Sequence, residues 1–191
     1  NITSTGVGTF GSLDISGDID VDGTTNLDAV DVDGAVNFAA DVTFADGADI
    51  ITASAGTSNF RAGVNAGNSI ASGGNYNVAV GDEAGTALTT GDKNTAVGFE
   101  ALKTEDAHGG HTAIGYQALK TLDSGSDSFN TAVGAGSGAA MTTGGNNALV
   151  GGVAGETLTV GSHNVAVGSI SLRFDTQGSR AVAVGLGALM T

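Results

Sequence analysis

The sequence of 191 residues contains no proline, no cysteine and no tryptophan, and aromatic residues make up only 5% of it. Without cysteine, the chain can form neither a disulfide nor a thiolate metal site. Its apolar residues, 40% of the total, are dominated by alanine and valine. Such small side chains bury little area each, so we do not expect a broad globular core. The composition favours a thin, repetitive architecture such as a solenoid or a narrow fibre.

Positive charge is also scarce. Six Lys and Arg stand against twenty Asp and Glu, which gives a net charge of −14. No Lys or Arg precedes Arg61, whereas ten aspartates lie between Asp14 and Asp49. The chain therefore lacks the basic surface that nucleic-acid binding requires, and anionic membrane surfaces would repel it. We expect no nucleic-acid partner and no membrane insertion, since no apolar run approaches the length of a spanning helix.

A five-residue pattern, typified by Asn-Thr-Ala-Val-Gly, recurs from residue 77 onward. Its glycines are separated by 17, 17, 19, 17, 17 and 17 residues. They are Gly81, Gly98, Gly115, Gly134, Gly151, Gly168 and Gly185. A decayed copy, Asn59-Phe-Arg-Ala-Gly63, precedes them. So constant a spacing predicts that each repeat is one coil of a β-solenoid, with successive coils joined by parallel ladder hydrogen bonds.

Within a repeat, the strand is followed by a glycine turn, a small or apolar pair such as Ala101-Leu102, and a polar turn such as Thr90–Lys93. We expect two short extended segments and two turns in each coil. The glycine permits a tight corner with positive φ or close backbone packing. The recurrent asparagines are expected to form a structural ladder of side-chain amide bonds along the stack. They are Asn77, Asn94, Asn130, Asn147 and Asn164.

The first fifty residues alternate apolar and acidic positions without a 17-residue unit, and the alternation changes parity at Ala29-Val30. One extended chain cannot cover its own apolar face, so three intertwined chains are expected. The predicted fold is all-β and homotrimeric, with an intertwined triple-stranded β shaft followed by a parallel β-roll or β-solenoid. We divide it into an acidic shaft (1–50), a transition with the decayed repeat (51–76) and the solenoid (77–191). Because the chain starts at Asn1 and ends within a repeat, we expect a piece of a longer protein.

Two glycine- or aspartate-rich motifs in this first part imitate ligand sites. Gly6–Gly11 matches the dinucleotide fingerprint, but the strand–turn–helix context is missing. Asp18–Gly23 imitates the opening of a calcium loop, although Ala29 stands where a bidentate glutamate is needed. We favour a solvated strand face there, with loose divalent-cation binding by three such faces as the alternative.

Histidines and aromatic rings supply the other candidates. His108 and His111 are close in sequence, and His163 is distant; a threefold axis could gather histidines into a metal site, but surface or ladder histidines are the commoner case. Phe99 and Tyr116 occupy one position of adjacent repeats and could stack on a sugar or, as we prefer, pack between subunits. We assign no catalytic, cofactor-binding or metal-binding residue, leave the receptor-binding residues unassigned, and expect neither a cofactor nor enzymatic activity.

The repeats at 94–102 (Asn-Thr-Ala-Val-Gly-Phe-Glu-Ala-Leu) and 111–119 (His-Thr-Ala-Ile-Gly-Tyr-Gln-Ala-Leu) resemble the head repeats of YadA-type trimeric autotransporter adhesins, over about 59–191. They look closer still to repeat arrays of bacteriophage tail fibres. The aspartate-rich segment 17–31 is similar to tail-fibre shaft sequence, especially that of marine phages. The adhesin head repeat is shorter than 17 residues, which favours the phage branch.

Either resemblance implies a homotrimer, a left-handed parallel β-roll in each subunit, and attachment to a surface. We expect a structural component of a phage tail fibre, located in the virion tail, that projects toward the host cell surface. Its partners would be two further copies of itself, tail proteins at its N-terminal side, and a host glycan or protein. The alternative is the head of a bacterial trimeric surface adhesin. A β-helical polysaccharide depolymerase is disfavoured, because carboxylates after residue 60 are few and scattered in turns.

Overall fold

The computed structural model describes residues 36, 52 and 54–190 of the chain. The chain divides into two compact units, Asn1–Gly47 and Ala48–Thr191, and nearly all described residues belong to the second. The predicted shaft over 1–50, with its Gly6–Gly11 and Asp18–Gly23 motifs, lies outside the described residues except for Val36.

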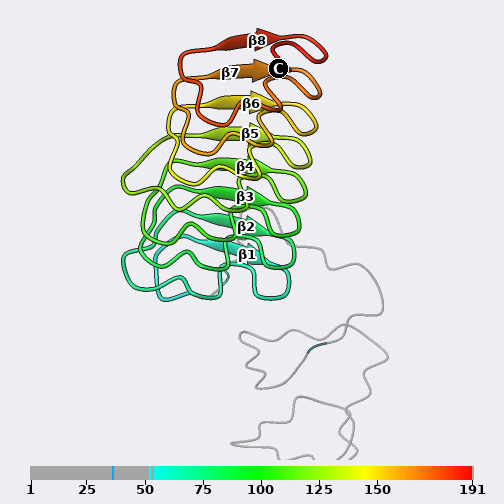
Figure 1. The fold of residues 1–191 in the computed structure, drawn as a ribbon. Helices are drawn as coiled ribbons and strands as arrows, with labels where there is room; N and C mark the ends of the chain where they lie inside the picture. Colours follow the sequence, from blue (N-terminus) through cyan, green and yellow to red (C-terminus); the bar gives the residue numbers. More distant parts are fainter. Residues whose placement is uncertain (1–35, 37–51, 53, 191) are drawn as a thin grey trace, which may run out of the picture. The chain divides into compact units, whose positions relative to one another are not determined.

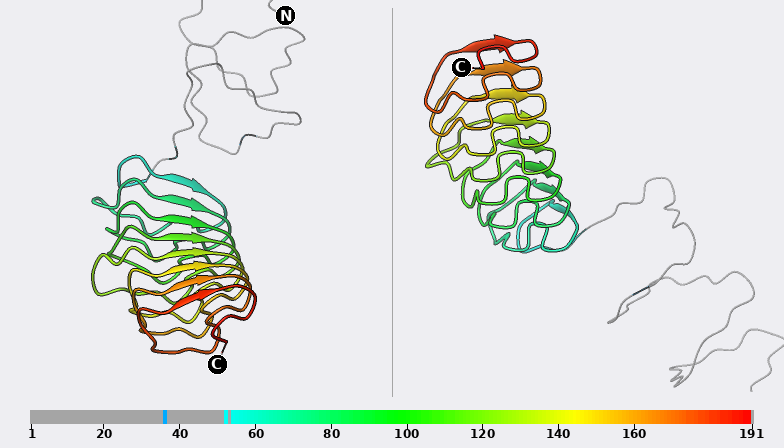
Figure 2. Two further views of the ribbon diagram at one scale, coloured as in Figure 1. Left: turned by 90° about the horizontal axis from the view of Figure 1, so that it is seen from above. Right: turned by 45° about the vertical axis from the view of Figure 1, so that its right-hand side comes forward.

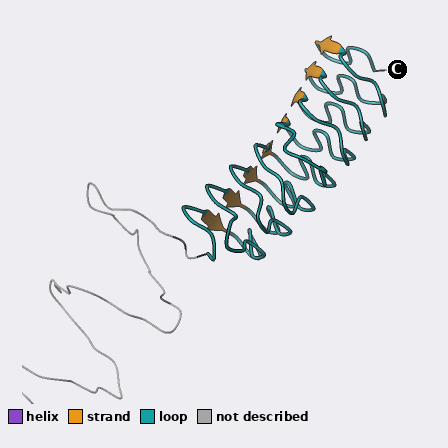
Figure 3. Cartoon of the chain, turned by 90° about the vertical axis from the view of Figure 1, so that its left-hand side faces the viewer, coloured by secondary structure: helices purple, strands orange, loops and turns teal. Residues whose placement is uncertain are grey.

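The second unit is a parallel β-solenoid, and its described residues contain strands and turns but no helix (Figures 1 and 3). Eight three-residue strands form one parallel sheet in chain order, all on one side of the stack (Figure 2). They are β1 (Phe60–Ala62), β2 (Val78–Val80), β3 (Thr95–Val97), β4 (Thr112–Ile114), β5 (Thr131–Val133), β6 (Ala148–Val150), β7 (Val165–Val167) and β8 (Val182–Val184). The predicted all-β solenoid of about 17-residue coils is thereby confirmed.

The strand register is constant along the stack. Equivalent residues face each other in every pair; Ala79, for example, is opposite Ala96. The sheet keeps this register between β4 and β5, where Thr112 is opposite Thr131 although that coil has two extra residues. The extra residues lie between the buried Leu122 and the ladder residue Asn130, in a polar turn at 123–129 that we call the enlarged turn.

Each coil contains one strand, so the prediction of two extended segments in each coil is wrong. The apolar segment after the glycine is a run of turns. In it, Glu83 and Gly85 have φ of 57° and 55°, a left-handed conformation that lies outside the β region. The coils are nevertheless hydrogen-bonded there, since Gly85 N donates to Ala101 O at 2.9 Å. Inter-coil bonding thus extends beyond the sheet.

The repeat glycines adopt the conformation that the sequence predicts. Gly81 has φ of +119°, and its equivalents in the other coils range up to +138°. A Cβ built on Gly81 would lie 2.8 Å from the carbonyl carbon and oxygen of Gly98 in the next coil. Both the positive φ and this close approach exclude a larger residue.

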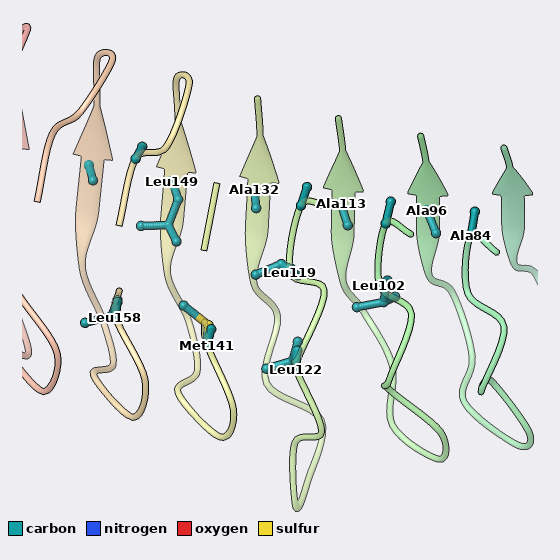
Figure 4. Packing of buried hydrophobic residues seen from close by; sticks show 14 of the residues in the cluster. Ala84, Ala96, Leu102, Ala113, Leu119, Leu122, Ala132, Met141, Leu149 and Leu158 are labelled. Atoms are coloured by element: carbon teal, nitrogen blue, oxygen red, sulfur yellow. The ribbon is translucent and has the colours of Figure 1, made fainter. Parts of the chain in front are cut away.

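The core is narrow and built from small columns of equivalent residues (Figure 4). The central residue of each strand points inward, as Ala96 and Leu149 do, and both are fully buried. A second column lies seven residues after each glycine; we call it the leucine column. Its members are Ile70, Leu88, Glu105, Leu122, Met141, Leu158 and Asp175. Five of these seven are apolar and buried, which makes the two carboxylates conspicuous.

The predicted asparagine ladder is present, with a different bonding scheme. Asn94 N donates to Asn77 Oδ1 at 2.8 Å, and Asn77 Nδ2 donates to Gly91 O at 2.8 Å. The links between rungs are therefore mostly from backbone to side chain. An amide-to-amide bond occurs between Asn147 Nδ2 and Asn130 Oδ1 at 3.1 Å. Because every rung is buried and bonded, the ladder stabilises the stack.

Candidate functional site

A buried carboxylate interrupts the leucine column at Glu105, whose side chain is fully inaccessible to solvent. Its Oε2 accepts hydrogen bonds from Ser124 N at 2.9 Å and Ser124 Oγ at 2.7 Å. Its Oε1 accepts one from His108 N at 3.0 Å and lies 3.3 Å from His108 Nδ1. A buried carboxylate is tolerated only when donors replace its hydration, and Glu105 has such donors from two coils.

A buried histidine replaces asparagine in the ladder at the end of the same coil. His111 N donates to Asn94 Oδ1 at 3.0 Å, as an asparagine would. His111 Nδ1 accepts the backbone N–H of Asn130 at 3.3 Å, so the proton of the neutral ring is on Nε2. Nε2 lies 3.3 Å from Ser124 Oγ. Burial lowers the pKa of His111, and the nearby Glu105 opposes that effect in part.

Glu105 and His111 together hold the enlarged turn of the following coil. Ser124, near the start of that turn, is bonded to the Glu105 carboxylate and contacts the His111 ring. At the other end of the turn, Asp127 Oδ1 accepts the backbone N–H of Gly109 at 3.0 Å. The enlarged turn is therefore attached at two points to the coil before it.

The structure brings together two of the three histidines named from the sequence. His108 and His111 both approach Glu105, while His163 lies in a later coil, where its backbone N–H donates to Gly145 O. Glu105, Asp106 and His108 offer potential metal-ligand atoms within 4.8 Å of one another. Because donors already occupy both Glu105 oxygens, we assign no metal to this cluster.

A column of exposed side chains runs along the polar turns, one residue before each ladder position; we call it the turn column. It comprises Ser58, Tyr76, Lys93, Gly110, Phe129, Asn146, His163 and Arg180. All eight have left-handed φ, between 38° and 81°, and all except Gly110 are exposed. This conformation directs the backbone inward, so that the ladder residue that follows is buried while the turn-column side chain stays on the surface.

Gly110 leaves a gap in the turn column, and a pocket of about 290 Å³ occupies this region. Lys93 lies on one side of the gap and Phe129 on the other. The pocket is lined by Thr90, Asp92, Lys93, Ala107, Gly109, Gly110, Asp127 and Phe129. Sequence reasoning missed it, since it treated the carboxylates of these turns as scattered. The adjacent glycines at 109 and 110, just before the 19-residue coil, were the available clue.

The two carboxylates of the pocket each have one oxygen engaged by the backbone. Asp92 Oδ1 accepts the N–H of Asn75 at 2.6 Å, and Asp127 Oδ1 accepts that of Gly109. The second oxygen of each carboxylate forms no hydrogen bond with the described part of the chain, and Lys93 forms no ion pair there. Both acceptors and donors are thus present for a ligand.

The aromatic pair named from the sequence lies on another face, after the strands β3 and β4. The rings of Phe99 and Tyr116 stack with centroids 5.6 Å apart and 16° between their planes, and both are partly exposed. Each ring therefore has one face covered by the other. Whether sugar or a neighbouring subunit covers the outer faces stays a prediction.

An ion-pair network lies beside these rings. Glu100 accepts hydrogen bonds from Lys103 at 2.7 Å and Gln117 at 2.7 Å, and pairs with Lys120 at 2.6 Å. These partners, Lys103 above all, lower the pKa of Glu100 to about 2. Lys103 also pairs with Glu83, so the network joins three successive coils.

These features define a parallel β-solenoid in which polar substitutions hold one enlarged turn against its neighbour. No protein-family model matches the chain, and neither a curated protein nor a solved structure matches it. None of the described residues forms a helix that could cross a membrane.

Proposed function

We propose that this chain is a structural component of a phage tail fibre, which projects toward the host cell and helps to attach to its surface. The observation that carries the proposal is the regular stack of eight in-register parallel strands. A solenoid of this kind grows by adding coils, so it gives length and stiffness at low sequence complexity. The repeat motifs that resemble tail-fibre arrays add support.

The outer face of the strands supports association with further copies of the chain. The third residue of every strand is aliphatic: Ala62, Val80, Val97, Ile114, Val133, Val150, Val167 and Val184. Several are substantially exposed in the single chain even where a coil lies on either side; Val167 and Ile114 each retain 38% of their accessible surface and Val150 retains 37%. Contiguous exposed apolar surface of this kind marks an interface. We propose that two further copies cover it, in the homotrimer that the alternating pattern of residues 1–50 also calls for.

The mass of the full chain in solution tests the assembly. We expect light scattering coupled to gel filtration to give three times the chain mass of 18.4 kDa. Val167→Asp, which places a carboxylate on the strand face, should dissociate the trimer. Val160→Asp is the matched control, because Val160 is exposed in a turn and not on that face. A monomeric wild-type chain would contradict the proposal.

The biological setting is tested separately. Antibodies against the chain should label the tails of purified phage particles in immunogold electron microscopy. Labelling of bacterial surfaces and not of phage tails would support the alternative, the head region of a bacterial trimeric surface adhesin. Both settings place the chain outside the cell, and both are compatible with the same solenoid.

A further inference from the structure

We propose that the pocket between Lys93 and Phe129 is a saccharide-binding site. This inference rests on the proposed attachment function for its biological meaning, since it names the class of surface ligand. The site itself consists of the gap at Gly110, the groups around it and the buried residues that hold the enlarged turn.

The first element of the site is an apolar platform. Phe129 has 61% of its surface exposed, although it lies in a turn held at both ends by hydrogen bonds. A Cβ built on Gly110 would lie 2.5 Å from the Phe129 ring, so only glycine permits this position of the ring. An exposed, fixed aromatic face can stack on the C–H face of a pyranose ring, because both are flat and apolar.

The second element is a mixed set of hydrogen-bonding groups. Asp92 and Asp127 each present one carboxylate oxygen without a bond to the described residues, and Lys93 presents an ammonium group. Carboxylates accept hydrogen bonds and an ammonium donates them. A sugar hydroxyl does both, so neighbouring hydroxyls of one ring can use both kinds of partner.

The mixed set of donors and acceptors favours a neutral polyol over the other candidates for an aromatic site. An amine would be attracted by the two carboxylates and the ring, but it is repelled by Lys93 and has no acceptor for the hydrogen bonds that Lys93 donates. A phosphate or sulfate would be attracted by Lys93 alone and repelled by Asp92 and Asp127. A saccharide avoids both repulsions, and a volume of about 290 Å³ accommodates a ligand of one or two rings.

The third element is preorganisation by the buried cluster. Ser124 is bonded to Glu105, and Asp127 is bonded to Gly109, so the turn that carries Phe129 is attached before any ligand arrives. A ligand therefore does not have to order the loop, which reduces the entropic cost of binding. Glu105 is a positioning residue in this scheme and does not contact the ligand.

Saccharide binding by the full chain tests the site. A glycan array identifies a bound saccharide, and titration by NMR or calorimetry measures its affinity. We expect Phe129→Ala to weaken binding about tenfold, the size expected for loss of a stacked ring. Tyr76→Ala is the matched control: Tyr76 is equally exposed in the turn column but does not line the pocket, so affinity should be unchanged. Asp127→Asn, which keeps the size of the side chain, should also weaken binding.

The possible outcomes separate the two proposals. Absence of binding to any saccharide on the array overturns the saccharide site, and so does an equal loss of affinity in the Phe129 and Tyr76 variants. Selective capture of an amine or an anion overturns it as well. Because oligomeric mass is measured on the same sample, a trimer without saccharide binding leaves the fibre proposal intact. A monomer that binds saccharide through Phe129 contradicts the trimer alone.

Discussion

The backbone nitrogen of Asn130 donates a hydrogen bond to Nδ1 of His111, 3.3 Å away, where the neighbouring rungs of the ladder offer an asparagine oxygen. An asparagine oxygen is an acceptor at every pH, whereas Nδ1 is an acceptor only in the neutral imidazole. One rung of this buried ladder is thus sensitive to protonation.

Acidification should destabilise the solenoid through this rung. Burial lowers the pKa of His111 in the folded chain, so the unfolded chain takes up the proton more readily. The stabilisation is fully present above the unfolded value of about 6.5 and is lost as pH falls from there toward the lowered folded value. Glu105, Asp127 and His108 are the other titratable groups whose charges act on the ring.

Thermal unfolding followed by circular dichroism between pH 8 and pH 5 checks this expectation. The melting temperature of the wild type should fall with pH, and His111→Asn should flatten that dependence because it restores a rung that does not titrate in this range. Identical pH profiles for the two proteins would show that His111 is not the responsive group.

Replacing Glu105 by the residue type typical of its column should weaken the fold. Glu105→Leu matches Leu88 and Leu122 but leaves Ser124 N and Oγ without their carboxylate acceptor. An unsatisfied buried polar group costs about 1–3 kcal/mol, so we expect a loss of that size in the free energy of unfolding. Asp106→Ala is the control, since this neighbouring carboxylate is exposed. Chemical denaturation measures the free energy of unfolding of both variants. Equal losses in the two would contradict the role of Glu105 in holding Ser124 and the enlarged turn.

Strong acid should destabilise the solenoid through a second group, the carboxylate of Glu100. Lys103, Lys120 and Gln117 lower the pKa of Glu100 to about 2, from an ordinary value of 4.5. The stabilisation from this carboxylate is present above pH 4.5 and disappears as pH falls through about 2. Glu100→Gln should therefore make unfolding less dependent on pH in that window. An acid titration of the wild type and the variant, monitored by circular dichroism, measures how steeply each protein unfolds with falling pH. Equal pH dependence of the two proteins would contradict the role of Glu100.

A methyl group on a repeat glycine should be severely destabilising. Gly98 has φ of +127°, and a Cβ there would lie 2.6 Å from the carbonyl oxygen of Gly115. We expect Gly98→Ala to cost about 3 kcal/mol or more, because strained φ and a backbone clash combine. Gly125→Ala provides the comparison, since nothing lies within 4 Å of a Cβ at Gly125. Similar melting temperatures for the two variants would argue against this role of the glycine column.

Shortening the enlarged turn should leave the solenoid folded. Deleting Gly125 and Ser126 returns the coil to 17 residues, and the pairing of Thr112 with Thr131 does not depend on the turn length. We expect a far-ultraviolet spectrum like that of the wild type together with loss of saccharide binding, because Phe129 can no longer keep its place. Loss of the β spectrum would instead show that the turn is needed for folding.

The parts of the fold that could be predicted are those that repeat. Gly81 and its equivalents recur at nearly constant spacing, and a glycine at every turn of a stack indicates a corner with positive φ or close backbone packing. Asn77 and its equivalents recur in the same way, and they indicated a buried ladder. The prediction of a second extended segment in each coil was wrong, because the amino-acid composition does not show that non-glycine residues such as Glu83 adopt a left-handed φ. Glu105 was overlooked for a related reason: its role depends on Ser124 in the next coil, and pairing across coils is visible only once the register is known.

The turn column has a consequence for how such a chain can diversify. Its side chains follow one backbone conformation, yet they include an aromatic ring, an amine, an amide, an imidazole and a guanidinium. Because the packing of the core does not select among the exposed members, a single codon change at a position outside the coupled pair Gly110 and Phe129 can alter the chemistry of the surface without requiring a compensating change elsewhere. The chemistry of this face and the folding of the solenoid are thereby encoded by largely separate sets of residues.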